Sequence, residues 1–352
     1  GVRLVGSEMC IRDRLVPVEF GMNIGVLGGG SWGTTVAHLL SRRYNVTLWA
    51  RNSDIVNEIN VHHTNHRYLS SAQLSQKLQA TDRLQDATNG QSVLVMAIPA
   101  QNFRAVLTDA AGYLDPLTPI VSLSKGLEFS TGARMTEIIQ AVCPKHPAAV
   151  LTGPNLAREV MAGFAAASVL ATPNAADQSH LQSIFHSPLF RVYTNDDVIG
   201  CELCGVLKNI IAIAAGMSDG LGAGNNTRAA IITRGLAEIT RLGLAMGAKS
   251  ETFSGLAGMG DLVTTCTSAQ SRNHTVGFKL GQGDSIDNII QEMFMVAEGI
   301  KSAPAVMRLA EQFGVEMPIA AEVMQVVTGQ RDVQGSFKAL LRAGVGREDE
   351  PF

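Results

Sequence analysis

The chain has 352 residues, of which 46% are hydrophobic and 17% are charged, and its formal net charge is −3. This composition is typical of a globular protein, and the length predicts two domains with cores of their own. The charge argues against a nucleic-acid partner, because no basic excess is present to neutralise phosphates. No uninterrupted apolar run reaches the roughly 18 residues that span a bilayer, so we do not expect a protein embedded in a membrane.

The first 21 residues differ in pattern from the rest of the chain. Charged residues such as Arg3, Glu8 and Arg12 interrupt each apolar stretch, so the segment lacks the apolar core of a secretory signal. Met22 directly precedes the first convincing strand and is a plausible native start. We therefore interpret residues 1–21 as a non-native or disordered extension and leave them out of the functional interpretation.

A strand, a glycine-rich turn and a helix follow from Asn23. The run NIGVLG predicts the strand, WGTTVAHLLSRR predicts an amphipathic helix, and Gly28, Gly30 and Gly33 have the spacing G-x-G-x-x-G. In this setting Gly28 allows a tight turn, Gly30 lets backbone N–H groups approach a pyrophosphate, and Gly33 permits close packing of helix on strand. We therefore predict a dinucleotide site at the helix N-terminus. The alternative is a glycine-rich turn that binds nothing.

The end of the second predicted strand, NVTLWA, indicates which dinucleotide binds. An NAD-selective site places Asp or Glu about 20 residues past the glycines, where it holds the ribose 2′-hydroxyl. This chain instead has Ala50, Arg51 and Asn52 there, with no acidic residue before Asp54. An arginine accommodates a 2′-phosphate. We predict that NADP(H) is preferred and NAD(H) is possible, the alternative being that Arg51 is a solvated surface residue.

Four more apolar runs predict strands, and they alternate with helical patterns such as NFRAVLTDAAGYL. The runs are Ser92–Pro99, Pro119–Gly126, Ala148–Pro154 and Ala165–Ala171. This alternation predicts an α/β fold, a Rossmann-like and doubly wound sheet over residues 22–200. Ligands of such sheets lie beyond the carboxyl ends of the strands, which is where Lys125 and the turn Thr152–Asn155 fall.

Three histidines, His62, His63 and His66, lie close together in VHHTNHRY. His62 and His66 are four residues apart and could share a helix face toward zinc. No carboxylate or cysteine completes a ligand set nearby, so we interpret the stretch as a polar loop and predict no metal.

The five cysteines are an odd number in a chain without an export signal, which indicates reduced thiols and a cytoplasmic protein. Cys201 and Cys204 have the spacing of a redox pair. They adjoin an apolar helix, however, and no thioredoxin-like pattern surrounds them. We interpret them as small buried residues.

The stretch GVLKNIIAIAAG, Gly205–Gly216, predicts a buried helix that contains one unexpected residue. Apolar residues cover more of it than one amphipathic stripe requires, yet Lys208 stands in the middle with no acidic residue within one turn on its C-terminal side. On this stretch alone, the favoured interpretation is a lysine that snorkels, with its ammonium in water. The alternative is a buried amine whose pKa desolvation has lowered into the range of a usable acid or base.

From residue 201 to residue 345 the strand signals stop and helical patterns take over, which predicts an all-helical second domain. The glycine-rich segment Gly216–Asn226 separates the lysine helix from a long helix near Thr227–Met246. A further helix follows the short segment Ala297–Gly299. This domain therefore has a pattern quite different from that of the first.

Polar residues in the second domain gather between Gly255 and Gly277. Asp261 sits among small residues, and Ser271, Arg272 and Asn273 offer a hydroxyl, a guanidinium and an amide in sequence. That triple suits a phosphate, because arginine binds oxyanions through two hydrogen bonds and its neighbours can fill the remaining acceptors. The same triple is equally typical of a helix cap on a solvated loop.

Six segments of the chain together resemble the soluble NAD(P)-dependent glycerol-3-phosphate dehydrogenases of the bacterial type. They are GVLGGGSWGTTVA, SLSKGLE, TGPNLAREV, LKNIIAIAAGMSDGLGAG, GMGDLVTTCTSAQSRN and VAEG, in order from Met22 to about residue 340. The resemblance implies a Rossmann-like domain followed by an all-helical domain. It also implies interconversion of sn-glycerol 3-phosphate and dihydroxyacetone phosphate in the cytoplasm, supplying glycerophospholipid synthesis, by a homodimer.

The resemblance also implies roles for individual residues, with Lys208 as the proton acceptor. The implied substrate contacts are Lys125, Gly153, Asn155, Lys208, Asp261, Ser271, Arg272 and Asn273. The cofactor contacts, the glycines of the turn included, are Gly28, Gly30, Ser31, Trp32, Gly33, Arg51, Lys125, Ala157, Arg272, Val296 and Glu298. Asn155 departs from the family, which usually has Ser or Thr there, but an amide can still donate a hydrogen bond to the substrate.

These roles imply a mechanism. With the phosphate held on Ser271, Arg272 and Asn273, neutral Lys208 takes the proton of the C2 hydroxyl while hydride leaves C2 for the nicotinamide. In the reverse direction its ammonium returns the proton. Lys125 is expected to keep Lys208 near neutrality by like-charge repulsion, and Asp261 to orient it.

Two other functions stay open at this point. A 3-hydroxyacid-type dehydrogenase of similar architecture pairs its helix lysine with an asparagine four residues on, whereas Asn209 directly follows Lys208 here. A non-catalytic sensor of nicotinamide nucleotides would keep the glycines but would not need both lysines and Asp261. The motifs favour the dehydrogenase that acts on glycerol 3-phosphate.

Overall fold

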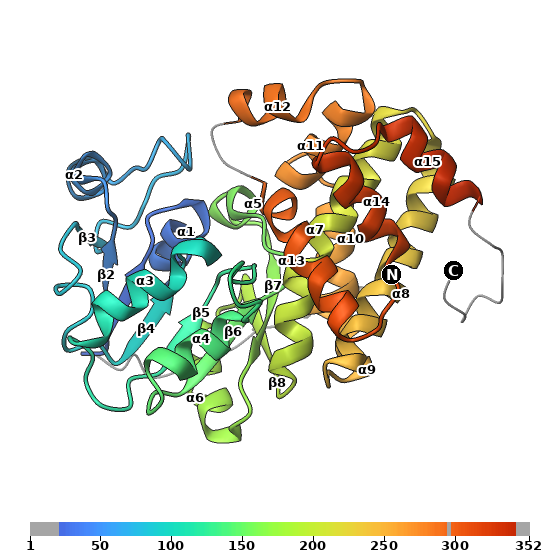
Figure 1. The fold of residues 1–352 in the computed structure, drawn as a ribbon. Helices are drawn as coiled ribbons and strands as arrows, with labels where there is room; N and C mark the ends of the chain where they lie inside the picture. Colours follow the sequence, from blue (N-terminus) through green and yellow to red (C-terminus); the bar gives the residue numbers. More distant parts are fainter. Residues whose placement is uncertain (1–20, 294–296, 343–352) are drawn as a thin grey trace, which may run out of the picture.

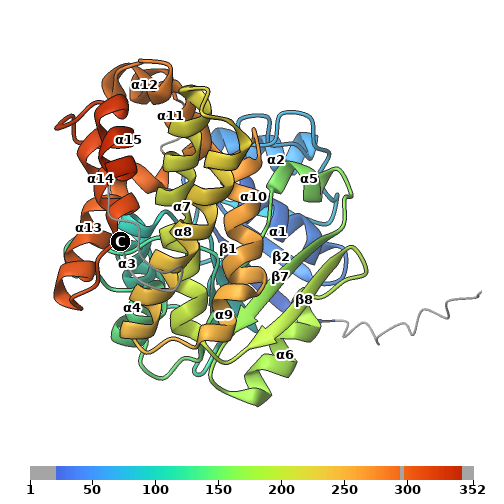
Figure 2. The same cartoon turned by 90° about the vertical axis from the view of Figure 1, so that its right-hand side faces the viewer.

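The computed structural model describes residues 21–293 and 297–342. These residues form two parts that lie side by side, a sheet covered by helices and a bundle of helices (Figure 1). Figure 2 shows the long helices α7 (Val198–Gly220) and α8 (Gly224–Ala245) next to each other and close to the last strands of the sheet. The predicted extension lies outside the described residues, except for Gly21.

The sheet has eight strands among the described residues, in the order β3-β2-β1-β4-β5-β6-β7-β8. Neighbouring strands are parallel except β6 and β7, which are antiparallel. The strands are β1 (Asn23–Leu27), β2 (Asn45–Trp49), β3 (Gln79–Thr81), β4 (Val93–Met96), β5 (Ile120–Ser122), β6 (Ala148–Thr152), β7 (Ala166–Ala171) and β8 (Phe190–Asn195). Because β4 returns to the other side of β1, the sheet is doubly wound, and the predicted Rossmann-like fold class is confirmed.

The two edge strands, β3 and β8, were not predicted. β3 has only three residues, too few for a pattern. In β8 buried Phe190 and Val192 alternate with exposed Arg191 and Tyr193. The inner strands, in contrast, are continuous apolar runs because helices cover both faces of the sheet. The position at the edge explains why the sequence signal of both strands is weak.

Six helices connect the strands and cover the sheet. They are α1 (Ser31–Ser41), α2 (Ser53–His62), α3 (Ala100–Ala111), α4 (Met135–Val142), α5 (Ala157–Met161) and α6 (Ala175–Phe185). Asn52 and Asn174 begin α2 and α6, and each side chain accepts two backbone N–H groups of the first turn. These caps satisfy donors that have no partner inside the helix.

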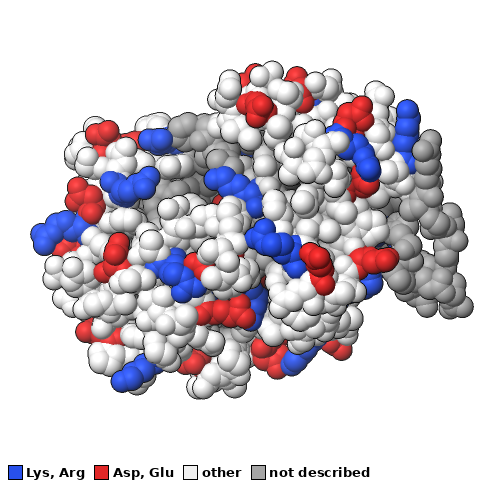
Figure 3. All heavy atoms as spheres, viewed as in Figure 1, with Lys and Arg blue, Asp and Glu red and all other residues white. Residues whose placement is uncertain are grey.

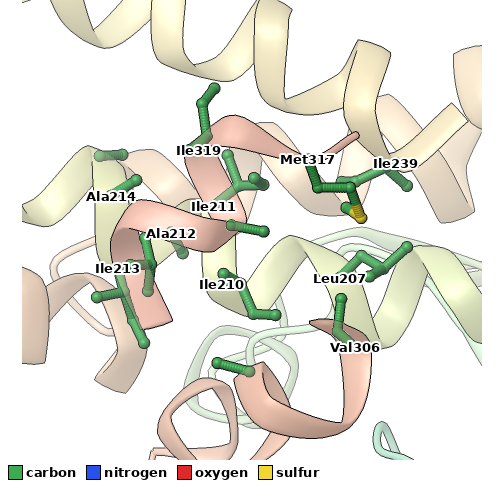
Figure 4. Packing of buried hydrophobic residues seen from close by; sticks show 14 of the residues in the cluster. Leu207, Ile210, Ile211, Ala212, Ile213, Ala214, Ile239, Val306, Met317 and Ile319 are labelled. Carbon is green, nitrogen blue, oxygen red and sulfur yellow. The ribbon is translucent and has the colours of Figure 1, made fainter. Parts of the chain in front are cut away.

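The second part is helical throughout the described residues. Besides α7 and α8 it contains α9 (Ser250–Ser254), the π-helical turn η1 (Leu256–Gly260), α10 (Asp261–Thr267), α11 (Arg272–Gly281), α12 (Ile286–Glu292), α13 (Glu298–Gln312), α14 (Pro318–Val327) and α15 (Val333–Arg342). Figure 4 shows apolar side chains of α7 meeting those of neighbouring helices in a common core. The predicted boundary at residues 200 and 201 falls within the first turn of α7, and the division into domains stays a prediction.

Helix α7 explains the apolar stretch seen in the sequence. It is long and apolar enough to cross a membrane by composition, with a mean hydropathy of 1.8, but 89% of its most apolar window is buried inside the protein. Its side chains therefore serve as the core of the helical part. The charged surface is mixed, since acidic and basic side chains are interspersed over the face seen in Figure 3.

Candidate active site

The glycines at the N-terminus of α1 divide into two kinds. Gly28 has a φ of +124°, and a Cβ there would lie 2.3 Å from the Ala97 carbonyl oxygen, while a Cβ on Gly33 would lie 2.0 Å from that of Gly28. The fold itself requires these two. A Cβ on Gly30, in contrast, would meet no described atom within 4 Å. The space in front of Gly30 is therefore open.

The N–H groups at this end of α1 also fit an anion. Gly30 is the N-cap of α1, and no side-chain cap or acidic residue occupies the first turn. The amides of Ser31 and Trp32 therefore face the open space with the positive end of the helix dipole behind them. This arrangement fits the pyrophosphate of a dinucleotide. The Trp32 ring itself packs at 6.0 Å from the ring of Phe190.

Arg51 lies two residues after the end of β2 and is exposed. The next residue, Asn52, is occupied as the cap of α2. Asp54 is exposed in the first turn of that helix. A guanidinium rather than a carboxylate therefore stands just beyond β2.

Lys208 is buried, with 6% of its surface exposed. Its Nζ donates to Oδ1 of Asp261 at 2.5 Å and to the hydroxyl of Thr265 at 2.7 Å. The favoured interpretation of the isolated stretch, a lysine that snorkels into water, is wrong. The partner that the helix itself lacks comes from α10, 53 positions further along the chain.

Lys125 reaches the same carboxylate from the sheet. It lies in the loop after β5, and its Nζ donates to Oδ2 of Asp261 at 2.7 Å and to the carbonyl oxygen of Gly153 at 3.0 Å. Asp261 is 2% exposed and holds one lysine on each oxygen. The two parts of the molecule thus meet in a chain of polar contacts from Lys208 through Asp261 and Lys125 to Gly153.

This environment changes the acidity of Lys208. Its pKa is lowered to about 8: burial is the largest cause, Asp261 opposes the shift, and the nearby Lys125 adds to it. Desolvation and repulsion from Lys125 were both predicted from the sequence, and desolvation is the larger cause. An amine with this pKa can exchange a proton near neutral pH.

The triple Ser271, Arg272 and Asn273 forms the N-terminus of α11. Ser271 is buried and caps the helix, with Oγ accepting from the N–H of His274 at 3.3 Å. Asn273 donates to Oδ1 of Asn209 at 3.0 Å and accepts from the N–H of Gly299 at 2.9 Å. The cap interpretation is therefore confirmed for Ser271, and Asn273 ties three helices together.

Arg272 and Glu298 lie beside this network. Arg272 is exposed, and its charge acts on the partly buried carboxyl group of Glu298 at the start of α13. Burial raises the pKa of that carboxyl group, and Arg272 opposes the shift. The positive end of α11 and the guanidinium thus favour an anion here. Val296, which precedes this segment, lies outside the described residues.

Asn155 has partners of its own on β7. Its Oδ1 accepts from the hydroxyl of Ser168 at 2.7 Å, and its Nδ2 donates to the carbonyl oxygen of Ala167 at 3.1 Å. One amide N–H has no partner among the described residues. Ala157, two residues further, begins α5 and packs in part against the core of the sheet.

Neither Thr265 nor Asn209 was predicted from the sequence to be a site residue. Thr265 lies one turn after Asp261 and accepts from Lys208. Asn209 links Lys208's helix to α11 through Asn273. A spacing of four after Asp261 and an amide directly after Lys208 were the available signals, but neither identifies a partner before the helices are placed.

The remaining sequence interpretations concern residues outside the cluster. His62 is the last residue of α2, so the predicted polar loop begins at His63. His66 contacts the Glu58 carboxylate at 2.6 Å. Cys201 and Cys204 are buried, as predicted, and burial raises the pKa of both thiols.

Comparison with known proteins agrees over both parts of the chain. Residues 23–178 match the family described as NAD-dependent glycerol-3-phosphate dehydrogenase N-terminus, and residues 197–338 match the corresponding C-terminus. The chain is 57% identical over 330 residues to a glycerol-3-phosphate dehydrogenase [NAD(P)+] of Sphingopyxis alaskensis, covering 94% of this chain and 99% of the other. It is 50% identical to one of Mycobacterium tuberculosis, covering 92% and 95%.

A solved structure shows the same fold. The crystal structure of glycerol-3-phosphate dehydrogenase from Coxiella burnetii superposes with a TM-score of 0.87 at 39% identity, covering 91% of this chain and 99% of that one. The sheet, the helical part and their arrangement are therefore shared with this relative.

Proposed function

Because this chain belongs to the NAD-dependent glycerol-3-phosphate dehydrogenase family, we propose that Lys208 is the acid–base group with which it interconverts sn-glycerol 3-phosphate and dihydroxyacetone phosphate. The observation that carries this role is the buried contact of Lys208 with Asp261, which Lys125 shares from the other side. A primary amine of lowered pKa is thereby held at a fixed place between the two parts of the molecule.

In this proposal Lys208 accepts the proton of the C2 hydroxyl during oxidation and returns it to the carbonyl oxygen during reduction. A bound nicotinamide supplies or accepts the hydride. Asp261 orients the Lys208 amine and, through its second oxygen, fixes Lys125. Lys125 contacts substrate and cofactor, and its charge disfavours a second positive charge on Lys208.

Arg272 binds the phosphate of the substrate in this proposal, with Ser271 and Asn273 beside it. The support is the position of Arg272 at the N-terminus of α11, where an anion is favoured by charge and by the helix dipole. Asn273 is occupied by Asn209 and Gly299, so its role includes holding α11 in place.

The cofactor lies in front of Gly30 in this proposal, with its pyrophosphate on the N-terminus of α1. Arg51 at the end of β2 favours NADP(H), while NAD(H) stays usable. The remaining cofactor contacts are Gly28, Ser31, Trp32, Gly33, Lys125, Ala157, Arg272, Val296 and Glu298. Gly153 and the unpartnered N–H of Asn155 complete the substrate side.

The proposed cellular setting follows from membership of the family. A phosphorylated three-carbon alcohol made by a reductase is the backbone of glycerophospholipids, so we place the activity in the cytoplasm at the start of their synthesis. We expect a homodimer, as in the family. No metal takes part in this proposal.

The test is a spectrophotometric assay at about 340 nm, where reduced nicotinamides absorb, with dihydroxyacetone phosphate and either NADPH or NADH. Oxidation of NADPH that depends on dihydroxyacetone phosphate is the expected result. Turnover of 3-keto acids instead would support the hydroxyacid dehydrogenase, and binding of NADPH without any turnover would support a sensor.

A further inference from the structure

Glu202 is a buried carboxylate that the mechanism does not use. It lies on α7, and its side chain is 4% exposed. Its Oε2 accepts from Nη1 of Arg134 at 2.7 Å and from the hydroxyl of Thr136 at 2.5 Å, and its Oε1 accepts from the N–H of Thr136 at 2.9 Å. Both partners belong to the N-terminus of α4 in the sheet part. Glu202 therefore caps a helix of one part from a helix of the other.

Arg134 is more than a counter-ion, because it closes the loop that carries Lys125. It forms an isolated bridge with Leu127, two residues after Lys125. Its guanidinium also contacts Glu137 at 2.7 Å, so it is held from several directions and is only 11% exposed. The loop between β5 and α4 thus carries Lys125 near its start and ends at the residue that Glu202 holds.

The same side of α7 meets Lys125 again one turn further on. A Cβ on Gly205 would lie 3.4 Å from Cγ of Lys125, so the stem of that lysine passes directly over the helix. Lys208 follows after three more residues. Successive turns of α7 therefore hold the end of the loop, the stem of Lys125 and, through Asp261, its amine.

We propose that Glu202 is a positioning residue for the dehydrogenase: by holding Arg134 and the N-terminus of α4, it fixes the loop that keeps Lys125 on Asp261 and next to Lys208. It touches neither substrate nor cofactor. The proposal rests on the proposed role of Lys208. If the loop is released, Lys125 moves away from Asp261, and the substrate site changes although both lysines are still present.

The release has a second consequence, which a merely structural role would not produce. The groups that face Lys208 are Asp261 and Cys266 from α10 and Lys125 from the loop. Lys125 lowers the pKa of Lys208 and also competes for Asp261. When Lys125 is displaced, both effects weaken, and the pKa of Lys208 rises. Oxidation of glycerol 3-phosphate needs neutral Lys208. The pH at which the oxidation rate rises must therefore move to a higher value.

The experiment compares Glu202→Gln with the wild-type enzyme. We expect kcat/KM for dihydroxyacetone phosphate to fall roughly ten- to hundredfold, because a displaced catalytic group costs about that much. The midpoint of the pH profile of glycerol 3-phosphate oxidation should rise by about half a unit, a roughly threefold change in acid constant. The dissociation constant for NADPH, measured by fluorescence, should rise much less than kcat/KM falls, because only the Lys125 contact is displaced and the turn at Gly30 stays in place.

Glu238→Gln is the matched control. Glu238 is also a buried carboxylate that caps a helix from a neighbouring one, accepting from the N–H groups of Ile319 at 2.7 Å and Ala320 at 3.2 Å, but it holds α14 and no part of the lysine cluster. It should lower the melting temperature without moving the pH profile. If Glu202→Gln behaves like Glu238→Gln, with an unshifted profile and wild-type kcat/KM, the proposal is wrong.

Two further variants keep the result decisive. If Glu202→Gln does not fold, Arg134→Lys takes its place, since it keeps the charge but cannot bridge Glu202 and Glu137 together. An unshifted profile in a folded Arg134→Lys overturns the proposal equally. Lys208→Ala is measured alongside: full activity in that variant would refute the proposed function itself, whereas its loss together with a normal Glu202→Gln refutes only the positioning role.

Discussion

The two ends of the site differ in how their polar groups are arranged before any ligand binds. At the cofactor end, the first turn of α1 has no side-chain cap and the space in front of Gly30 is open. At the substrate end, Lys208 and Lys125 already bind the two oxygens of buried Asp261. The cofactor end therefore presents backbone donors that have no partner among the described residues, whereas the polar groups of the substrate end are already hydrogen-bonded to one another.

This difference determines what each end can do. Open backbone donors recognise any pyrophosphate, so selectivity must come from an exposed side chain such as Arg51. A buried network holds its groups without reorganisation and shifts the pKa of Lys208, which is what proton transfer requires. Substitutions should therefore affect binding at the first end and turnover at the second.

Lys208→Ala tests the network of Lys208, Asp261 and Lys125 most directly. We expect kcat to fall by roughly 10²–10⁴, the usual contribution of a positioned acid–base group. Folding should persist because Asp261 keeps its contact with Lys125, and NADPH should bind as in the wild type. The measurement is steady-state turnover of dihydroxyacetone phosphate with NADPH, with the melting temperature as control. Near wild-type kcat in a folded variant would make Lys208 a packing residue.

Arg272→Ala tests the phosphate side of the substrate site, at the N-terminus of α11. Losing a charge-assisted contact to the phosphate should cost about 2–5 kcal/mol, seen as a higher KM for dihydroxyacetone phosphate. Unphosphorylated dihydroxyacetone lacks the group that Arg272 binds, so its slow turnover should change little. An equal loss with both substrates would separate Arg272 from the phosphate.

The sequence predicted the cofactor end of the site better than the substrate end. Gly28, Gly30 and Gly33 lie within six positions, and their spacing alone indicates the strand, the turn and the helix. The inner strands were equally clear because both of their faces are buried. Local patterns of this kind need no knowledge of distant residues.

The substrate end depends on contacts between residues far apart in the chain. Asp261 lies 53 positions from Lys208 and 136 from Lys125. Nothing near Lys208 shows that a carboxylate will meet it, and for that reason its own stretch favoured snorkelling. The family resemblance supplied this grouping. It did not supply Glu202, whose partners lie 66 and 68 positions away.

Arg51→Asp tests the selectivity of the cofactor end for NADPH over NADH. We expect the preference for NADPH over NADH to reverse, because the carboxylate repels the 2′-phosphate and accepts from the ribose diol. The contact of the wild-type guanidinium is worth about 1.5–3 kcal/mol, or roughly ten- to hundredfold in the ratio of kcat/KM values. That ratio is measured for both cofactors in both proteins. An unchanged ratio would mean that Arg51 points into solvent and another residue selects the cofactor.

Asn155 combines features of both ends, and its effect should be the smallest. β6 and β7 stop pairing at Thr152 and Val169, so the carbonyl of Ala167 lies beyond the ladder and takes its hydrogen bond from Asn155. The other amide N–H is left for the substrate. Asn155→Ala should therefore raise KM for dihydroxyacetone phosphate by only about two- to tenfold, the value of one neutral hydrogen bond.

The same variant should also lose stability, by about 1–3 kcal/mol, since it removes the partners of Ala167 and Ser168. Ser168→Ala is the control that separates the two effects: it removes the donor to Oδ1 of Asn155, yet the amide is still tied to Ala167. A higher KM in Asn155→Ala alone would place the free N–H on the substrate. A lower melting temperature with an unchanged KM would mean that Asn155 serves only to hold β7 through Ala167 and Ser168.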